Sequence, residues 1–243
     1  MIISIYIFVV IIVLAVPAAV VLFPFTLITG NVRPLYATGC WIARFAIGAA
    51  GIRVRIEGRE RIPAGRACIF MANHVSNLDA PALLPNLPGR TSVFIKRPLM
   101  KLPILGYACK LAAFIPVDRT GDAAEAEAAV AEAQRVLASG LHITTFVEGR
   151  RSPDAHLLPF KKGPFYLAKD SGAPCIPVSI VGTEKILPWG SMRIHPGTAH
   201  VIFHPAVDPA SYATRDELSD AVRAVISSAL PESMRSQAAP SDH

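Results

Sequence analysis

A histidine and an aspartate follow the apolar run 67–72 at a spacing that could form a proton-transfer pair. His74 and Asp79 lie five positions apart, and an imidazole removes a proton best when a carboxylate holds its second nitrogen. On a continuous helix the two side chains would point about 140° apart, so they can meet only where a strand turns into a helix. A surface histidine beside a helix-capping aspartate fits the same spacing. The pair is therefore a catalytic candidate that depends on such a turn.

A second polar segment, 146–152 (FVEGRRS), also follows an apolar run. Adjacent arginines at the end of a strand can bind a phosphate through paired hydrogen bonds, and a neighbouring glycine lets backbone amides approach the ligand. Arg150 and Arg151 are therefore candidate phosphate ligands. A solvated turn with unpaired arginines is the alternative that these residues leave open.

Cations alternate with apolar residues over 94–119, a stretch that contains Lys96 and ends at Arg119. This alternation is typical of a surface that faces lipid. The part 102–114 fits an ordinary core helix equally well, with Arg119 as a salt-bridge partner. The later run 176–182 could line a pocket, although a core strand explains it better.

Short apolar runs and helical patterns alternate from about residue 52 onward. Continuous apolar runs predict buried strands, and the longer amphipathic stretches predict helices between them. This order indicates an α/β domain with a mixed sheet flanked by helices. The expected strands are 67–72, 91–96, 142–147 and 175–181, followed by a hairpin across 195–198 into a last strand, and the expected helices are 122–139 and 214–230.

The hydrophobic excess of the chain is concentrated at its amino terminus. Of the 243 residues, 52% are hydrophobic and 17% are charged, and the first charged residue is Arg33. As a helix, residues 1–23 would reach about 35 Å, enough to cross a hydrocarbon core of about 30 Å. A cleaved signal peptide is the alternative, but its positively charged start is missing. We expect a retained membrane helix that Pro17 and Pro24 interrupt or end.

The composition also excludes several classes of protein. Disorder, collagen and a small disulfide scaffold do not fit, and a multi-span transporter is disfavoured. The net charge of +6 suits attachment to anionic lipid, whereas the basic residues are too scattered to indicate nucleic acid. The four cysteines are 28, 41 and 66 residues apart, without metal-ligand spacing. We therefore expect separate thiols and no bound metal.

A second, less apolar segment, 35–51, is too short and too charged for another full span. It predicts an interfacial helix, or one that forms a hairpin with the first and enters a single leaflet. The first cationic cluster follows the first span, which predicts a globular domain on the cytoplasmic side. The expected organisation is a membrane anchor over 1–51, a catalytic domain over 52–235 and a flexible tail over 236–243.

Taken in order, these segments resemble the glycerolipid acyltransferases of the 1-acylglycerol-3-phosphate acyltransferase type. The resemblance covers about residues 52–205, and four blocks in the right order are far more specific than any one of them. An apolar amino-terminal helix pair also fits this family. The matching blocks are His74 to Asp79 for the family's H-x-x-x-x-D motif, 94–119 for its second block, 146–152 for its F-P-E-G-T-R-S block and 176–182 for its closing proline-containing strand.

The chain departs from the family pattern at three positions. Val147 stands where the family usually has proline, and Arg150 where it usually has threonine. In the second block, Pro98 occupies a position that is often acidic or small. The third block is where the family binds the acceptor phosphate, so these changes concern the acceptor more than the class of reaction.

The resemblance implies transfer of a fatty acyl group from acyl-CoA or acyl carrier protein to the free hydroxyl of 1-acylglycerol 3-phosphate, giving phosphatidic acid. It implies no bound cofactor, and membrane lipids and the acyl donor as partners. His74 would be the general base, and Asp79 would orient the imidazole and stabilise its charge. The implied substrate-binding residues are Arg151 supported by Glu148, together with Gly149, Ser152, Lys96 and Arg119.

Other functions fit parts of the same pattern. Arg150 keeps open another acceptor, such as a lyso-ornithine lipid or a lysophospholipid with a larger head group. A non-catalytic membrane protein that binds lipid is the alternative from another class, and the presence of both His74 and Asp79 disfavours it. A soluble secreted enzyme is disfavoured by the missing signal charge.

Overall fold

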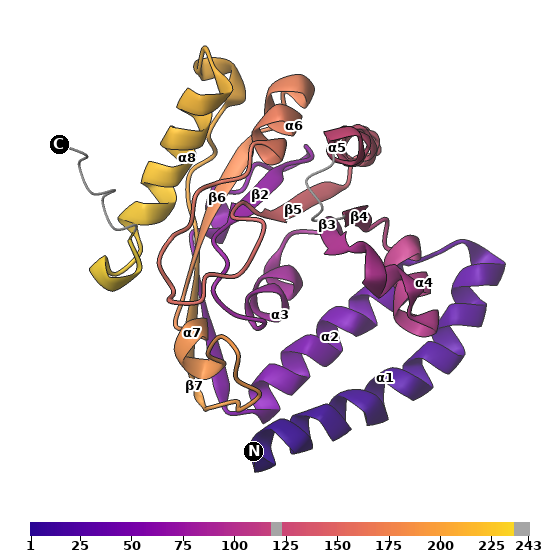
Figure 1. Ribbon diagram of the computed structural model, residues 1–243. Helices are drawn as coiled ribbons and strands as arrows, with labels where there is room; N and C mark the ends of the chain where they lie inside the picture. The colour runs from indigo at the N-terminus through magenta and orange to yellow at the C-terminus, as the bar shows by residue number, and fades with distance from the viewer. Residues whose placement is uncertain (118–122, 236–243) are drawn as a thin grey trace.

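The computed structural model describes residues 1–117 and 123–235, which form a seven-stranded sheet covered by helices on both faces (Figure 1). The strands are β1 (Ile52–Glu57), β2 (Ile69–Ala72), β3 (Thr91–Lys96), β4 (Ile115–Val117), β5 (His142–Phe146), β6 (Cys175–Val181) and β7 (Gly197–Phe203). Their order is β1-β7-β6-β2-β5-β3-β4. The five strands from β6 to β4 run parallel, whereas β7 pairs antiparallel with β6 and parallel with β1. The predicted mixed α/β sheet is therefore confirmed.

Strand β2 lies inside the sheet, between β5 and β6, and is buried on both faces as its apolar sequence predicts. Ile69 and Met71 join one hydrophobic cluster, whereas Phe70 and Ala72 join the other, and all four are 0% exposed. This alternation is the two-residue period of a strand. The strand begins two residues later than the predicted 67–72, and at Cys68 the amide donates to the His142 ring of β5 (3.1 Å) and not to a backbone carbonyl.

Helices cover the two faces of the sheet. The helices are α1 (Ile2–Thr29), α2 (Arg33–Ala49), α3 (Asp79–Leu83), α4 (Pro103–Leu111), α5 (Ala123–Ala138), α6 (Gly163–Ser171), α7 (Thr183–Ile186) and α8 (Arg215–Ser228). One face packs against α5, α6 and α8, and the other against α2, α3 and α7. The site is built from the loops that leave the carboxyl ends of β2, β5 and β6.

Two of the predicted helices were well placed. α5 lies within the predicted 122–139, and Gly140 follows it with φ of 85°, a left-handed conformation that suits the end of a helix. α8 lies within the predicted 214–230. Thr214 caps it by accepting a hydrogen bond from the amide of Glu217, whose side chain accepts from the Thr214 backbone. Pro231 follows its end, as expected.

The amino-terminal helix differs from its prediction at both prolines. α1 continues through Pro17 and Pro24 for 28 residues and ends at Gly30, which has φ of 67°. A proline removes one backbone hydrogen bond but leaves the bonds of the neighbouring turns in place. In the described part of the chain, α1 is the one helix long and apolar enough to cross a membrane.

Helices α1 and α2 run side by side as a hairpin along one side of the domain (Figure 1). The hydroxyl oxygen of Ser4 accepts a hydrogen bond from the amide of Ile194 (3.0 Å), and the Phe23 ring lies 5.8 Å from that of Tyr107 in α4. The two ends of α1 are thus tied to different parts of the domain. Its apolar surface nevertheless stays open, because only 6% of its most apolar window is buried.

The predicted hairpin across 195–198 is wrong. β7 begins at Gly197, inside that segment, and its antiparallel partner β6 ends at Val181. Helix α7 and a loop occupy the connection between them. Gly182, with φ of 92°, turns the chain out of β6 and into α7. The segment 195–198 therefore marks the start of a strand and not the tip of a hairpin.

Candidate active site

His74 and Asp79 meet at the turn from β2 into α3. Nδ1 of His74 lies 2.7 Å from Oδ2 of Asp79, which is the first residue of α3 and 0% exposed. The same Oδ2 accepts hydrogen bonds from the amides of Val75 (2.7 Å) and Ser76 (2.8 Å). The loop 74–76 therefore wraps around the carboxylate. His74 and Asp79 can meet because the chain turns between them, whereas on a continuous helix they would point apart.

The other oxygen of Asp79 is held by a residue that the sequence did not single out. The hydroxyl of Thr183, the first residue of α7, donates to Oδ1 of Asp79 at 2.6 Å, and both side chains are buried. Nearby, the Ser76 hydroxyl donates to the carbonyl of Leu187 at 2.8 Å. The turn after β6 thus holds the loop after β2 at two points. A buried carboxylate with each oxygen hydrogen-bonded is fixed in orientation.

The histidine ring lies against an aromatic side chain and keeps one nitrogen available. Its plane stacks on Phe146 with ring centroids 4.0 Å apart, and the side chain is 17% exposed. With Nδ1 directed at Asp79, Nε2 is the nitrogen that can exchange a proton with a ligand. No hydrogen bond reaches Nε2 from the described residues. An imidazole held in this way can accept a proton at Nε2.

Glu148 supports the histidine loop through its backbone. One carboxylate oxygen accepts from the amide of His74 (2.6 Å) and the other accepts from the amide of Leu158 (2.7 Å). The side chain is 1% exposed, and burial raises the pKa of Glu148 from 4.5 to about 7, although both amide hydrogen bonds oppose that change. The structure therefore places this predicted substrate-binding residue beneath the loop, where it joins two segments of the site.

The rest of the third block surrounds the same loop. Gly149 has φ of 69°, and a Cβ there would lie 2.9 Å from the Lys161 side chain. Ser152 is buried, donates its amide to the carbonyl of His74 (2.8 Å) and donates its hydroxyl to Asp154 (2.8 Å). Between them, Arg151 is half-buried and forms no ion pair with the described residues. Its guanidinium, like that of the exposed neighbour Arg150, remains available for a ligand.

Lys96 and Arg119 are the two predicted binding residues of the second block. Lys96 is the last residue of β3 and is exposed. Its strand runs parallel to β5, so it lies at the same edge of the sheet as Glu148. Arg119 lies outside the described residues. Among the described residues there is no group of three His, Cys, Asp or Glu side chains that could hold a metal ion.

Asn73 joins the histidine loop to the closing strand. Its side-chain amide donates to the carbonyl of Ile180 (2.9 Å), and its oxygen accepts from the Ile180 amide (2.7 Å). The run 176–182 is accordingly the core strand β6, the better of the two interpretations of its sequence. Asn73 itself carried no distinguishing spacing, because the pairing spans the sheet and is invisible along the chain.

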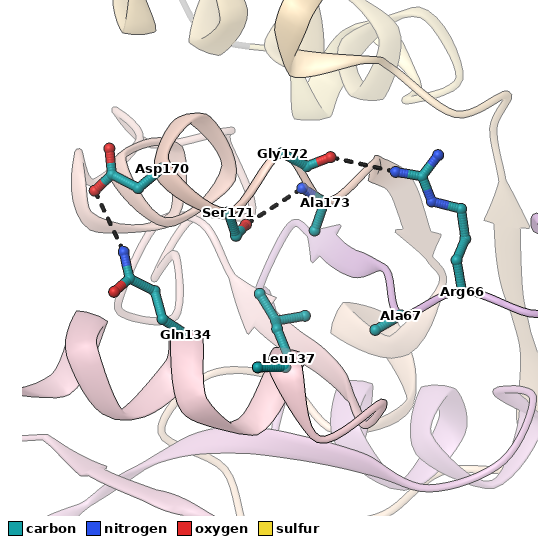
Figure 2. Close-up of a pocket in the computed structure, with 9 residues that line it drawn as sticks. Arg66, Ala67, Gln134, Leu137, Asp170, Ser171, Gly172 and Ala173 are labelled. Atoms are coloured by element: carbon teal, nitrogen blue, oxygen red, sulfur yellow. Dashed lines mark hydrogen bonds between the residues drawn. The ribbon is translucent and has the colours of Figure 1, made fainter.

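The pocket in Figure 2 is not part of this site. It has a volume of about 440 Å³ and lies before the amino ends of β2 and β6, at the sheet edge opposite His74. Its polar groups are paired with each other. Arg66 donates to the carbonyl of Gly172 (3.3 Å), and the Gln134 amide lies 3.5 Å from an oxygen of Asp170.

The chain is similar to known acyltransferases in sequence and structure. A family model described as Acyltransferase matches residues 53–181. The 1-acyl-sn-glycerol-3-phosphate acyltransferase alpha of Homo sapiens is 34% identical over 178 residues, which cover 71% of this chain and 62% of the human protein. The chloroplastic 1-acyl-sn-glycerol-3-phosphate acyltransferase BAT2 of Brassica napus is 33% identical over 155 residues, which cover 63% and 44%. The match thus spans less than two thirds of these curated relatives.

Similarity to a solved structure covers more of the chain. The crystal structure of the 1-acyl-sn-glycerophosphate (LPA) acyltransferase PlsC from Thermotoga maritima superposes with a TM-score of 0.81 at 27% sequence identity. The superposition covers 93% of this chain and 92% of that one. The similarity therefore includes most of the molecule as well as the segment that the family model matches.

Proposed function

The chain belongs to the acyltransferase family, and from that premise we propose that it transfers a fatty acyl group to the free hydroxyl of 1-acylglycerol 3-phosphate, giving phosphatidic acid. Acyl-CoA or acyl carrier protein would supply the acyl group as a thioester. The observation that carries this proposal is the His74–Asp79 contact of 2.7 Å, which lies beside the loop that contains Arg151.

In the proposed reaction, Nε2 of His74 takes the proton of the acceptor hydroxyl as its oxygen attacks the thioester carbonyl. A new ester C–O bond forms, and collapse of the tetrahedral intermediate breaks the C–S bond. The imidazolium then returns the proton to the departing thiolate, so that the products are the ester and a free thiol. Asp79 stabilises the imidazolium. The acyl group passes directly to the alcohol, without a covalent enzyme intermediate.

Arg151 would bind the acceptor phosphate through charge-assisted hydrogen bonds, and Lys96 and Arg119 are further candidates for that role. Gly149 supports this by letting the backbone turn closely beside Lys161. Glu148 and Ser152 would act on the substrate indirectly, because their hydrogen-bond partners are backbone amides, a backbone carbonyl and Asp154.

We further propose that the protein is attached to a membrane with its catalytic domain on the cytoplasmic face. The open apolar surface of α1 supports attachment. Orientation is supported by the cations that follow this helix, beginning with Arg33.

An acceptor panel tests the proposed substrate. The full chain, purified in detergent, is given a labelled acyl-CoA or acyl carrier protein with lysophosphatidate, a zwitterionic lysophospholipid or a lyso-ornithine lipid. We expect lysophosphatidate to be the preferred acceptor. Equal rates on all three acceptors would reject it, and preference for a different one would assign the site to that acceptor.

Two neighbouring arginines provide a matched pair of variants for the phosphate. Arg151→Gln should raise the KM for lysophosphatidate by about tenfold or more, since a charge-assisted hydrogen bond contributes about 1.5–3 kcal/mol. Arg150 is exposed, and Arg150→Gln should have a much smaller effect. A larger increase in Arg150→Gln than in Arg151→Gln would contradict the assignment.

A further inference from the structure

A second pocket, of about 560 Å³, lies between α2, the segment 84–90 and the connection from α5 to β5. It borders the amino ends of two strands, because Arg90 directly precedes β3 and His142 begins β5. His74 and Glu148 follow the carboxyl ends of β2 and β5. The pocket is therefore at the opposite edge of the sheet from the proposed catalytic groups.

The charges that line this pocket are all positive. Arg33 and Arg90 line it, and none of its described lining residues is an aspartate or a glutamate. Neither arginine forms an ion pair within the described part of the chain. Apolar side chains, including Leu84, Leu87 and Leu141, form much of the remaining wall. The pocket thus combines two available guanidinium groups with a hydrophobic surface.

The walls are held in place by contacts within the protein. Arg44 of α2 donates to the carbonyl of Pro85. The Tyr36 hydroxyl accepts a hydrogen bond from the amide of Thr91 (3.3 Å). Nδ1 of His142 accepts one from the amide of Cys68 (3.1 Å). Tyr36 and His142 of the wall are therefore held by hydrogen bonds, and the pocket exists before any ligand arrives. A preformed pocket lowers the entropic cost of binding.

The position of the pocket indicates what could enter it. Arg33 is the first residue of α2, four positions after the last residue of the apolar helix α1. Arg33 thus places this end of the pocket beside the bend of the α1–α2 hairpin (Figure 1), next to the helix whose apolar surface is open. A ligand that reaches the pocket from a membrane would present a polar head to the arginines and hydrocarbon to the leucines.

We propose that this pocket binds the phosphate head group of an anionic membrane phospholipid. Guanidinium groups recognise phosphate through paired hydrogen bonds, and the adjoining leucines fit the first carbons of the acyl chains. The bound lipid is not the substrate, because the pocket is at the other edge of the sheet. It fixes the domain to the membrane at the hairpin bend, in addition to the contact made by α1.

The test counts phospholipid bound to the full chain by native mass spectrometry after purification in detergent. The probes are dioctanoyl phosphatidylglycerol, dioctanoyl phosphatidylcholine and inorganic phosphate. The variant Arg33→Gln/Arg90→Gln removes the two pocket charges. The control Arg53→Gln/Arg55→Gln removes the same charge from exposed positions of the edge strand β1.

We expect the pocket variant to bind phosphatidylglycerol at least about tenfold more weakly than the native chain, while the β1 control binds as the native chain does. Melting temperature and turnover on detergent-dispersed substrate should stay near native in both variants. The Arg151→Gln variant should keep its phosphatidylglycerol, which separates this site from the proposed acceptor site.

Four results would overturn the proposal. The pocket variant could bind like the native chain, or the β1 control could lose as much affinity as the pocket variant. Phosphatidylcholine could bind as tightly as phosphatidylglycerol, which would assign the contact to hydrocarbon alone. Inorganic phosphate could displace the lipid completely, which would assign the pocket to free phosphate. Loss of acyl transfer with lipid binding intact would instead reject only the proposed function.

Discussion

At the scale of single residues, the carboxylate of Asp79 has a partner on each side. It contacts Nδ1 of His74 and accepts hydrogen bonds from two backbone amides and from the Thr183 hydroxyl, at distances of 2.6–2.8 Å. If a buried carboxylate loses one of these partners, its orientation is less fixed, and the desolvation of the unpaired oxygen is no longer offset by a hydrogen bond. Thr183 is thus a positioning residue for the imidazole.

Thr183→Val tests this role with a side chain of nearly the same shape. Removal of the hydroxyl leaves Oδ1 of Asp79 unpaired, so kcat should fall about tenfold or more while KM for the acceptor changes little. Thr183→Ser keeps the hydroxyl and should restore most of kcat. Steady-state kinetics in detergent measure both. Equal loss in the serine and valine variants would show that the methyl group, not the hydrogen bond, matters.

Glu148 gives a prediction for the dependence of stability on pH. Its pKa is raised from 4.5 to about 7, chiefly by burial, so the folded state binds its proton more tightly than the unfolded state. The contribution of this group to stability should be complete below about pH 4.5 and should decline as the pH rises to about 7, by on the order of 3 kcal/mol.

Glu148→Gln removes this titration and provides the comparison. The glutamine variant also loses one backbone hydrogen bond, because its amide nitrogen cannot accept from an N–H group. Its melting temperature should therefore lie furthest below that of the native chain at low pH, and the gap should narrow between pH 4.5 and 7. Thermal melts of both proteins across this range measure it. A gap that widens with pH would contradict the assignment.

The catalytic pair could be proposed from the sequence, but its supports could not. The spacing of His74 and Asp79 after an apolar run already required a turn from strand to helix, and that turn is present. Thr183 is 104 positions from Asp79, and no local pattern links them. Glu148 was recognised by its block and given a place at the substrate. Its burial beneath the His74 loop depends on strand pairing that a linear motif does not describe.

At the scale of the elements, the turn between β6 and α7 determines where Thr183 lies. Gly182 has φ of 92°, and a Cβ at this position would lie 2.4 Å from the carbonyl oxygen of Thr198 in β7. Glycine is therefore required both by its conformation and by the neighbouring strand. The first helical residue after this turn, Thr183, is the one that holds the carboxylate of Asp79.

Gly182→Ala should destabilise the fold by about 2–4 kcal/mol and lower kcat, because the turn must shift to admit a methyl group. Gly65→Ala is the matched control. Gly65 also has a positive φ, 75°, but nothing lies within 4 Å of a Cβ there, so only about 1 kcal/mol should be lost. Melting temperatures and turnover of the two variants are compared. Similar losses in both would indicate that the close approach to Thr198 is unimportant.

Elements were predictable where the local pattern and the tertiary environment agree. β3 and β6 have the predicted bounds, since each is a largely apolar or β-branched run inside the sheet. The segment 195–198 carries turn residues but opens β7, because pairing with β1 extends the strand back to Gly197. Pro24 predicted the end of the first helix, yet α1 continues past it to Thr29. In both cases long-range packing or neighbouring helical turns outweigh a local signal.

At the scale of the whole molecule, the α1–α2 hairpin lies along the domain and is held at both ends of α1. In the proposed reaction, an acceptor with a long acyl chain remains in the bilayer while its head group must reach His74. The apolar face of α1 should therefore keep the catalytic edge of the sheet close to the lipid surface. On this account the hydrophobic excess of the chain contributes to substrate access as well as to attachment.

Val9→Lys/Val13→Lys/Val20→Lys tests this contribution in the full chain. These three side chains are 50%, 61% and 69% exposed, and each lysine opposes insertion by about 2.5–3.5 kcal/mol at the centre of a membrane. Turnover on bilayer substrate should fall, and protein should move from the membrane pellet to the supernatant. Turnover on detergent-dispersed substrate serves as the internal control and should stay near native. An equal fall in both assays would point to damaged folding.

The central claim is that His74 acts as the general base of an acyl transfer. The most direct test is the rate at which the detergent-purified full chain moves a labelled acyl group from a thioester donor to lysophosphatidate. His74→Ala should lower this rate by about 10²–10⁴-fold with its melting temperature near native, while His195→Ala, at an exposed position, should keep the native rate. Transfer by His74→Ala within a few-fold of the native rate would contradict the account.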